Sequence, residues 1–152
     1  MKTGEGTCAL EDGTVYSKRK GHCPFSAPKV EAYAAIVGEE RIERLLRAAK
    51  RKHGIQLLEI NSSAQGGGDA EMLFSTIPFL NNLGIEAEWK VIRGSREYFE
   101  ITQTLHNLLQ GKEGELTPEM KELYLCTLEE CANADLIDYE PNVVTVHDPQ
   151  PL

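Results

Sequence analysis

The feature that most constrains this chain is a short apolar run that leads directly into a glycine-rich loop and then into a helical pattern. Residues 55–60 have the length of a strand, and the loop at 61–68 ends in three consecutive glycines. Apolar residues then recur at helical spacing from Asp69 to Gly84, with Pro78 expected to kink the helix. Residues 86–92 alternate as a second strand does. The order strand, helix, strand predicts a parallel pair of strands.

Three further helices and one further strand are predicted. Residues 38–52 carry an apolar stripe opposite a basic face, Ser95 caps a helix that runs to Gly111, and Thr117 caps another. The inner face of this last helix is predicted to hold Met120, Leu123, Tyr124, Thr127, Cys131 and Ala134. Residues 142–146 form a run typical of a buried strand. The pattern predicts an α/β fold with a Rossmann-like, mostly parallel sheet and helices on both faces.

The first part of the chain has a different character. Residues 1–27 hold four glycines and scattered charge, with a weak alternation around Asp12-Gly13, a dipeptide that favours a tight turn. We expect a flexible arm or a small hairpin there, followed by one α/β lobe over residues 28–152. The chain of 152 residues is long enough for one ordinary core.

Charge and hydropathy exclude several classes of partner. The formal net charge of -8 opposes binding to nucleic acid, which needs clustered Lys and Arg, and residues 17–20 are interpreted as a solvated basic turn. No apolar run approaches the roughly 20 residues that span a bilayer, and the first residues lack the apolar core of a signal peptide. We therefore expect a cytoplasmic protein that binds neither nucleic acid nor membrane.

The four cysteines are expected to be reduced thiols in that location. Cys126 and Cys131 lie five apart on a predicted helix and point about 140° from each other, so they cannot share a metal. Cys131 is expected in the core. A zinc site from Cys8, His22, Cys23 and His53 is the alternative, but no Cys-x-x-Cys pair supports it.

In an open parallel sheet, ligands bind beyond the carboxyl ends of the strands. Gly66, Gly67 and Gly68 follow the first strand there, and their exposed amides, together with the next helix dipole, suit an anion. The spacing differs from the dinucleotide and phosphate-loop motifs, which disfavours a nicotinamide oxidoreductase or an ATPase. The alternative is a turn that only lets strand meet helix.

A second polar group follows the last strand. His147 and Asp148 stand at its end, in a loop that two prolines stiffen, and such a pair suits hydrogen bonds to sugar hydroxyls. The alternative is that His147 satisfies a buried backbone group. His106-Asn107 lies on the predicted helix between Ser95 and Gly111, where the pattern alone indicates only a polar helix edge.

Several motifs in order carry a family resemblance. They are Asn61-Ser62-Ser63, residues 66–71, residues 88–92, His106-Asn107-Leu108-Leu109-Gln110-Gly111 and Val146-His147-Asp148-Pro149-Gln150-Pro151. From about Tyr33 onward the chain resembles the amino-terminal region of the glycosyltransferring trehalose synthases, relatives of the retaining trehalose phosphorylases. Members of this family have two facing Rossmann-like lobes of the GT-B type.

The resemblance implies transfer of glucose from a nucleoside diphosphate glucose to a glucose acceptor, with retention. It implies that His147 and Asp148 line the catalytic acceptor pocket, with His106, Asn107, Gln110 and Gln150 as further acceptor contacts, and that Gly66, Gly67 and Gly68 approach the donor phosphates. Backbone amides rather than a metal would stabilise the charge on the leaving phosphate, so neither a metal nor a cofactor is expected.

Two departures from the family pattern matter. Asp69 stands where the family usually carries a small apolar residue, and a carboxylate there would repel an incoming phosphate. The sequence also stops before the lobe would be complete, as a fragment, a split gene product or a degenerate remnant would. We therefore expect little activity without a carboxyl lobe, and possible homo-oligomers formed through an open sheet edge. A non-catalytic sugar-binding or interaction module and the lobe of a trehalose phosphorylase stay open as alternatives.

Overall fold

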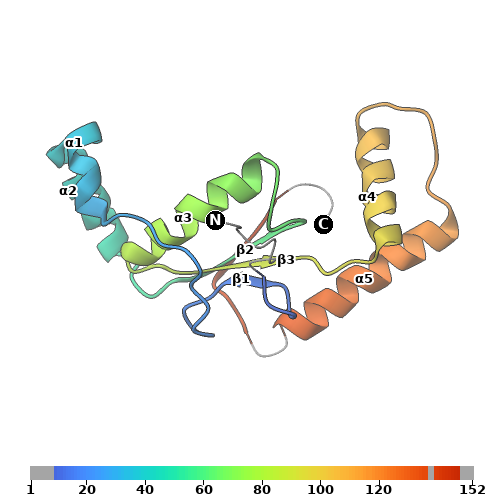
Figure 1. Cartoon of the computed structure of the whole chain (residues 1–152), viewed down its shortest axis with the longest axis horizontal. Coiled ribbons are helices and arrows are strands. Elements are labelled where there is room, and N and C mark those ends of the chain that lie inside the picture. The colour runs from blue at the N-terminus through green and yellow to red at the C-terminus, as the bar shows by residue number, and fades with distance from the viewer. Residues whose placement is uncertain (1–8, 137–138, 148–152) are drawn as a thin grey trace, which may run out of the picture.

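A computed structural model describes residues 9–136 and 139–147 of the chain (Figure 1). In chain order the elements are strand β1 (Thr14–Tyr16), the 3-10 helix η1 (Val30–Tyr33), helices α1 (Ala34–Val37) and α2 (Glu39–Lys50), β2 (Gln56–Asn61), α3 (Gly68–Asn82), β3 (Glu86–Val91), α4 (Arg96–Leu109), α5 (Pro118–Leu136) and β4 (Val143–Val146). From β2 onward the elements follow the predicted order, with α4 and α5 consecutive between β3 and β4, and α3 continues through Pro78.

The sheet has four strands in the order β1-β3-β2-β4. β2 lies in the middle and pairs in parallel with both β3 and β4, whereas β1 pairs antiparallel with β3. This arrangement confirms the predicted α/β fold with a mostly parallel sheet. In the parallel pairs Glu59 lies opposite Trp89 on one side and Thr145 on the other. Partners opposite each other project from the same face of a sheet, so these three side chains share a face.

The sequence did not predict that the segment before residue 28 adds a strand to this sheet. The turn at Asp12-Gly13 forms as expected, with a hydrogen bond of 2.9 Å from the Gly13 amide to the Leu10 carbonyl. Gly13 has a φ of 78°, and an added Cβ would lie 2.5 Å from the Val91 carbonyl oxygen, so only glycine fits where this turn meets β3. β1 follows directly, and its residues are buried.

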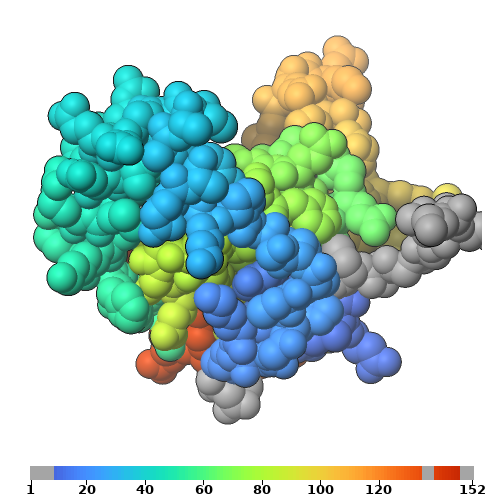
Figure 2. All heavy atoms as spheres, turned by 60° about the vertical axis from the view of Figure 1, so that its left-hand side comes forward, coloured from blue at the N-terminus to red at the C-terminus, as the bar shows by residue number. Residues whose placement is uncertain are grey.

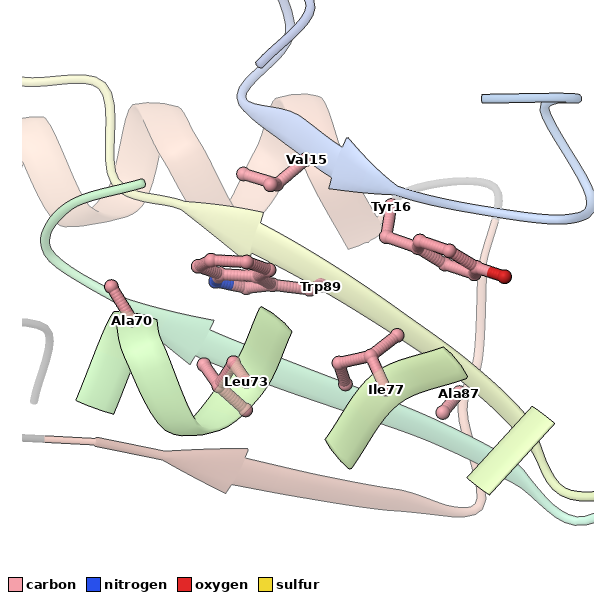
Figure 3. Close-up of a cluster of buried hydrophobic side chains, with 7 residues drawn as sticks. All are labelled: Val15, Tyr16, Ala70, Leu73, Ile77, Ala87 and Trp89. Carbon is pink, nitrogen blue, oxygen red and sulfur yellow. The ribbon is translucent and has the colours of Figure 1, made fainter. Parts of the chain in front are cut away.

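The main core lies between α3 and one face of the sheet. Figure 3 shows the Trp89 indole between β3 and α3, with the buried cluster around it, which comprises Val15, Tyr16, Ala70, Leu73, Ile77, Ala87 and Trp89. Phe74 and Phe25 meet the Trp89 ring edge-on at centroid distances of 5.1 and 6.0 Å. Such edge-on aromatic contacts stabilise the fold beyond the free energy gained by burying the ring, so Trp89 contributes strongly to the stability of the core.

The helices on either side of this core occupy opposite ends of the molecule. Figure 1 shows α1 and α2 at one end and α4 at the other, and in Figure 2 the end with α1 and α2 is turned forward. At the first end Val30, Ile42, Ala49 and Leu83 form a second apolar cluster. At the other end Ser95 caps α4 by accepting from the Tyr98 amide, as predicted, and the Tyr98 ring stacks on Tyr124 of α5. α5 passes behind the sheet, opposite α3 (Figure 3).

Two expectations about burial were wrong. Val143, Val144 and Val146 of β4 are exposed, although the run was predicted to be buried, because β4 is the last strand of the sheet and bonds to β2 on one side. On α5, Thr127 and Cys131 are buried but Leu123 and Ala134 are exposed, because α5 contacts the rest of the chain along a narrow strip. An apolar pattern records what a residue can pack against, whereas burial depends on which neighbours are present.

Candidate functional site

The glycine-rich loop after β2 and His147 after β4 both lie at the carboxyl edge of the sheet. The hydrogen-bond ladder continues past the strand ends, because the Ile92 amide donates to the Asn61 carbonyl at 3.0 Å and the His147 amide donates to the Ile60 carbonyl at 2.8 Å. The glycine-rich loop therefore leaves β2 at the same edge at which His147 leaves β4. This is where ligands bind in open parallel sheets.

The central contact at this edge joins Glu59 and His147. Glu59 Oε2 lies 2.6 Å from His147 Nε2, and the two side chains are 10% and 16% exposed. A hydrogen bond between an imidazole and a carboxylate is charge-assisted and stronger than one between neutral groups. His147 therefore lies at the carboxyl edge of the sheet, where the sequence predicted it. Its partner, the carboxylate of Glu59, was not predicted.

Asn61 connects the site to the core. Its Oδ1 accepts from Trp89 Nε1 at 2.8 Å, and its Nδ2 donates to the Ser63 carbonyl at 2.7 Å. The residue is buried, so both ends of its amide are satisfied by protein. Through these two bonds the position of the loop after β2 depends on the position of the Trp89 ring.

The loop itself is held by short local bonds. Ser63 Oγ donates to the Gln65 carbonyl at 2.6 Å and accepts from the Gln65 amide at 3.1 Å. Gly66, Gly67 and Gly68 are exposed, and a Cβ added at any of them would meet open space. Gly67 is the cap residue of α3 and makes no side-chain cap bond, so the first amides of the helix point outward without a capping side chain. Asp69 and Glu71 place negative charge in the same turn.

The predicted residues on α4 lie apart from this edge. His106, Asn107 and Gln110 occupy the end of the helix, which rises away from the sheet in Figure 1. Gln110 Nε2 lies 2.8 Å from His106 Nε2, and Lys112 Nζ donates to Asn107 Oδ1 at 3.0 Å. Within the described part of the chain, the structure does not bring these three residues into contact with His147 or the glycines. Asp148 and Gln150 lie outside the described residues.

The residue that sequence reasoning missed is Glu59. A signal for it was present, because a carboxylate inside a short apolar strand, two positions before Asn61, must project from the same face as Asn61. The alternation was interpreted only as a strand. Asn61 itself was named as part of a motif, but its bond to Trp89 depends on the pairing of β2 with β3.

Metal ligands are not clustered in the part of the chain that the structure describes, where no group of three His, Cys, Asp or Glu residues is close enough to hold an ion. Cys131 is buried, as predicted, and its Sγ donates to the Arg93 carbonyl at 3.4 Å. Cys23 and Cys126 are exposed, and Cys8 lies outside the described residues. Of the helices in residues 9–136 and 139–147, none has the length and hydropathy to cross a membrane.

Comparison with known proteins gives a consistent result. A family model described as "Trehalose synthase, N-terminal domain" matches residues 59–152. The chain is 46% identical over 125 residues to a trehalose synthase of Pyrococcus horikoshii, a match that covers 81% of this chain and 30% of that protein. It is 37% identical over 120 residues to a trehalose synthase of Rubrobacter xylanophilus, covering 78% of this chain and 29% of that protein.

A more distant match is to a trehalose phosphorylase of Pleurotus pulmonarius, which is 31% identical over 100 residues, or 62% of this chain and 14% of that protein. The chain thus spans about 30% of the length of the curated synthases that it matches.

Proposed function

The chain belongs to the family of trehalose synthase N-terminal domains, and from this premise we propose that it forms the acceptor-side lobe of a retaining glycosyltransferase. The reaction would transfer glucose from a nucleoside diphosphate glucose to a glucose acceptor and so form trehalose. Because the matched relatives are about three times longer, the proposal assigns the rest of the donor site to a second, carboxyl lobe. The lobe alone is then a sugar-binding half with little activity.

The observation that carries this proposal is the pair of the buried Glu59 and the half-buried His147 at the carboxyl edge of the sheet. A sugar hydroxyl can donate one hydrogen bond and accept two, so it suits a site that combines an acceptor carboxylate with an imidazole. Burial keeps competing water away from such groups and strengthens their electrostatic interactions. Asp148 and Gln150, which follow His147 in the chain, are proposed to complete the acceptor pocket.

The donor phosphates are proposed to approach the loop at Gly66, Gly67 and Gly68. Exposed backbone amides without side chains allow a close approach, and the amino end of α3 favours negative charge. Asp69 and Glu71 oppose this attraction, so the loop would contribute contacts rather than the main binding energy. His106, Asn107 and Gln110 are proposed as secondary acceptor contacts only, because His106 and Gln110 already bond to each other and Asn107 bonds to Lys112.

The lobe of a trehalose phosphorylase is the second candidate, favoured by the match to the Pleurotus protein. The chemistry of the acceptor side is shared by both reactions, since both join or separate the same two glucose units. Within the described residues, the site offers nothing that selects phosphate over a nucleotide as the group on the donor.

A chimera tests both candidates. Residues 59–152 of this chain would replace the matching segment of the Pyrococcus horikoshii trehalose synthase, and the folded product would be assayed for trehalose from a nucleoside diphosphate glucose and glucose. Trehalose formation supports the synthase assignment. Phosphate-dependent cleavage of trehalose, without synthesis from the nucleotide sugar, would favour the phosphorylase. A folded chimera that does neither, beside an active parent enzyme, would favour a non-catalytic module and contradict the proposal.

A further inference from the structure

We infer that Glu59 is a positioning residue that holds His147 with its Nε2 protonated, which leaves Nδ1 as the ring nitrogen for a sugar hydroxyl. The part of this inference that concerns the sugar rests on the proposed function. The part that concerns the orientation of the ring rests on the geometry alone.

Both ends of the contact are fixed by one backbone ladder. Glu59 is paired across the β2–β4 ladder with Thr145, and the ladder ends with the bond from the His147 amide to the Ile60 carbonyl. The Cα positions of the two residues are therefore set by paired strands rather than by a free loop. A side-chain bond of 2.6 Å built on such a frame can fix the direction of the imidazole ring.

The chemistry of the carboxylate then decides which nitrogen carries the proton. An ionised carboxylate can only accept hydrogen bonds, so the Nε2 that faces Glu59 must be the donor. This holds for the neutral imidazole and for the imidazolium. In the neutral ring Nδ1 is then an acceptor, and it can take a hydrogen bond from a hydroxyl group. The tautomer set at one nitrogen thus determines what the other nitrogen can do.

The surroundings of Glu59 argue against a purely structural role. It projects from the face of the sheet that α3 covers, next to Trp89 and Asn61, and both of these neighbours are uncharged. Burying a carboxylate there costs free energy that an apolar side chain in the same place would avoid. His147 is the side-chain partner that the structure gives to Glu59 among the described residues. The buried carboxylate of Glu59 is therefore best explained by its effect on the orientation of His147.

The test is nitrogen-15 NMR of the imidazole of His147 in the full 152-residue chain, because the shifts of the two ring nitrogens report which of them carries a proton. We expect Nε2 to be protonated in the wild type. In Glu59→Gln the side-chain amide can also donate to Nε2, so the form protonated on Nδ1 becomes populated. Glu88→Gln is the matched control, because Glu88 is also a buried carboxylate on a neighbouring strand, but it pairs with Arg19. This control is expected to leave the His147 spectrum unchanged.

Glucose added to the same samples tests the second half of the inference. We expect it to shift Nδ1 more than Nε2 in the wild type and to bind roughly tenfold more weakly to Glu59→Gln, the loss of about one good hydrogen bond. A wild-type ring protonated on Nδ1 alone would overturn the inference even if Glu59→Gln did not fold. An Nε2-centred response to glucose would also overturn it. If the tautomer is as expected but glucose moves neither nitrogen, the positioning role stands and the proposed function fails.

Discussion

Glu59 and His147 are 88 residues apart in the chain, yet Glu59 Oε2 and His147 Nε2 are separated by 2.6 Å. They meet because β4 lies beside β2 in the parallel sheet and pairs with it as far as Val146, the last residue of β4. The candidate site is therefore a product of strand order, and the features that hold β2 in place also hold the site.

Trp89→Phe tests the link between core and site. The change removes the hydrogen bond from Trp89 Nε1 to Asn61 Oδ1 and leaves a buried amide oxygen without a donor. We expect the free energy of unfolding to fall by about 1–3 kcal/mol from the unsatisfied acceptor, with a further loss from the smaller ring. Urea denaturation followed by circular dichroism measures it, because the variant has no tryptophan left to fluoresce.

Asn61→Ala and the double variant complete the cycle for that bond. If the Trp89 and Asn61 side chains interact, the sum of the two single-variant losses in unfolding free energy will exceed the loss in the double variant by about 1 kcal/mol. Strict additivity of the two losses would show that this hydrogen bond contributes nothing to stability.

Gly68→Ala tests the glycine-rich loop. An added Cβ would meet open space, and alanine is favoured over glycine within a helix, so stability should be unchanged or rise by up to about 1 kcal/mol. A methyl group would nevertheless obstruct close approach of phosphates to the loop. In the chimera we expect at least tenfold weaker binding of nucleoside diphosphate glucose, measured by calorimetry, with glucose affinity as the internal control. Equal affinity for the nucleotide sugar would remove these glycines from the donor site.

Arg19→Met tests the ion pair between the basic turn at residues 17–20 and Glu88 of β3. Arg19 donates two hydrogen bonds, of 3.0 and 3.3 Å, to the carboxylate of Glu88, whose side chain is buried, and its guanidinium lies 4.4 Å from the Tyr139 ring centroid. We expect the variant to lose about 1–3 kcal/mol in chemical denaturation. Arg47→Met breaks the exposed pair with Glu43 and serves as the control, with an expected change below about 0.5 kcal/mol. Similar losses in the two variants would contradict the structural role given to Arg19.

Acid stability should depend on Asp12. Burial alone would raise the pKa of this carboxyl, but hydrogen bonds from Lys20 and Thr14 outweigh it and hold the pKa well below its ordinary value of 3.8. A group whose pKa is lowered by folding stabilises the protein above the pKa of the unfolded chain and loses that contribution as the pH falls. Asp12→Asn should therefore show a shallower decline in unfolding free energy than the wild type below about pH 4. Parallel curves measured by urea denaturation at several pH values would argue against this.

Much of the fold could be predicted from the sequence because its signals are local. The stripe from Ile42 to Ala49, the cap at Ser95 and the run before Asn61 each depend on spacing within a few residues, and each element formed where it was expected. The motifs after β2 and β4 also predicted the correct family and the edge of the sheet at which His147 lies.

What could not be predicted depends on neighbours distant in sequence. β1 contains three residues, and its place in the sheet follows only from its pairing with β3. The exposure of Val144 reflects the position of β4 at the end of the sheet, which an apolar run cannot reveal. Glu59 became a candidate only when the pairing of β2 with β4 brought it to His147. The contacts of His106 with Gln110 and of Asn107 with Lys112 could likewise not be predicted from a motif.

We expect a sugar to bind at the carboxyl edge of the sheet, beside Glu59 and His147. The most direct test of this expectation is a two-dimensional amide NMR spectrum of the chain, titrated with glucose and then with a nucleoside diphosphate glucose. We expect a dispersed spectrum in which glucose shifts the amide signals of Glu59, Asn61 and His147, and the nucleotide sugar shifts those of Gly66, Gly67 and Gly68. A dispersed spectrum in which millimolar glucose moves no amide at this edge, or moves another face, would contradict it.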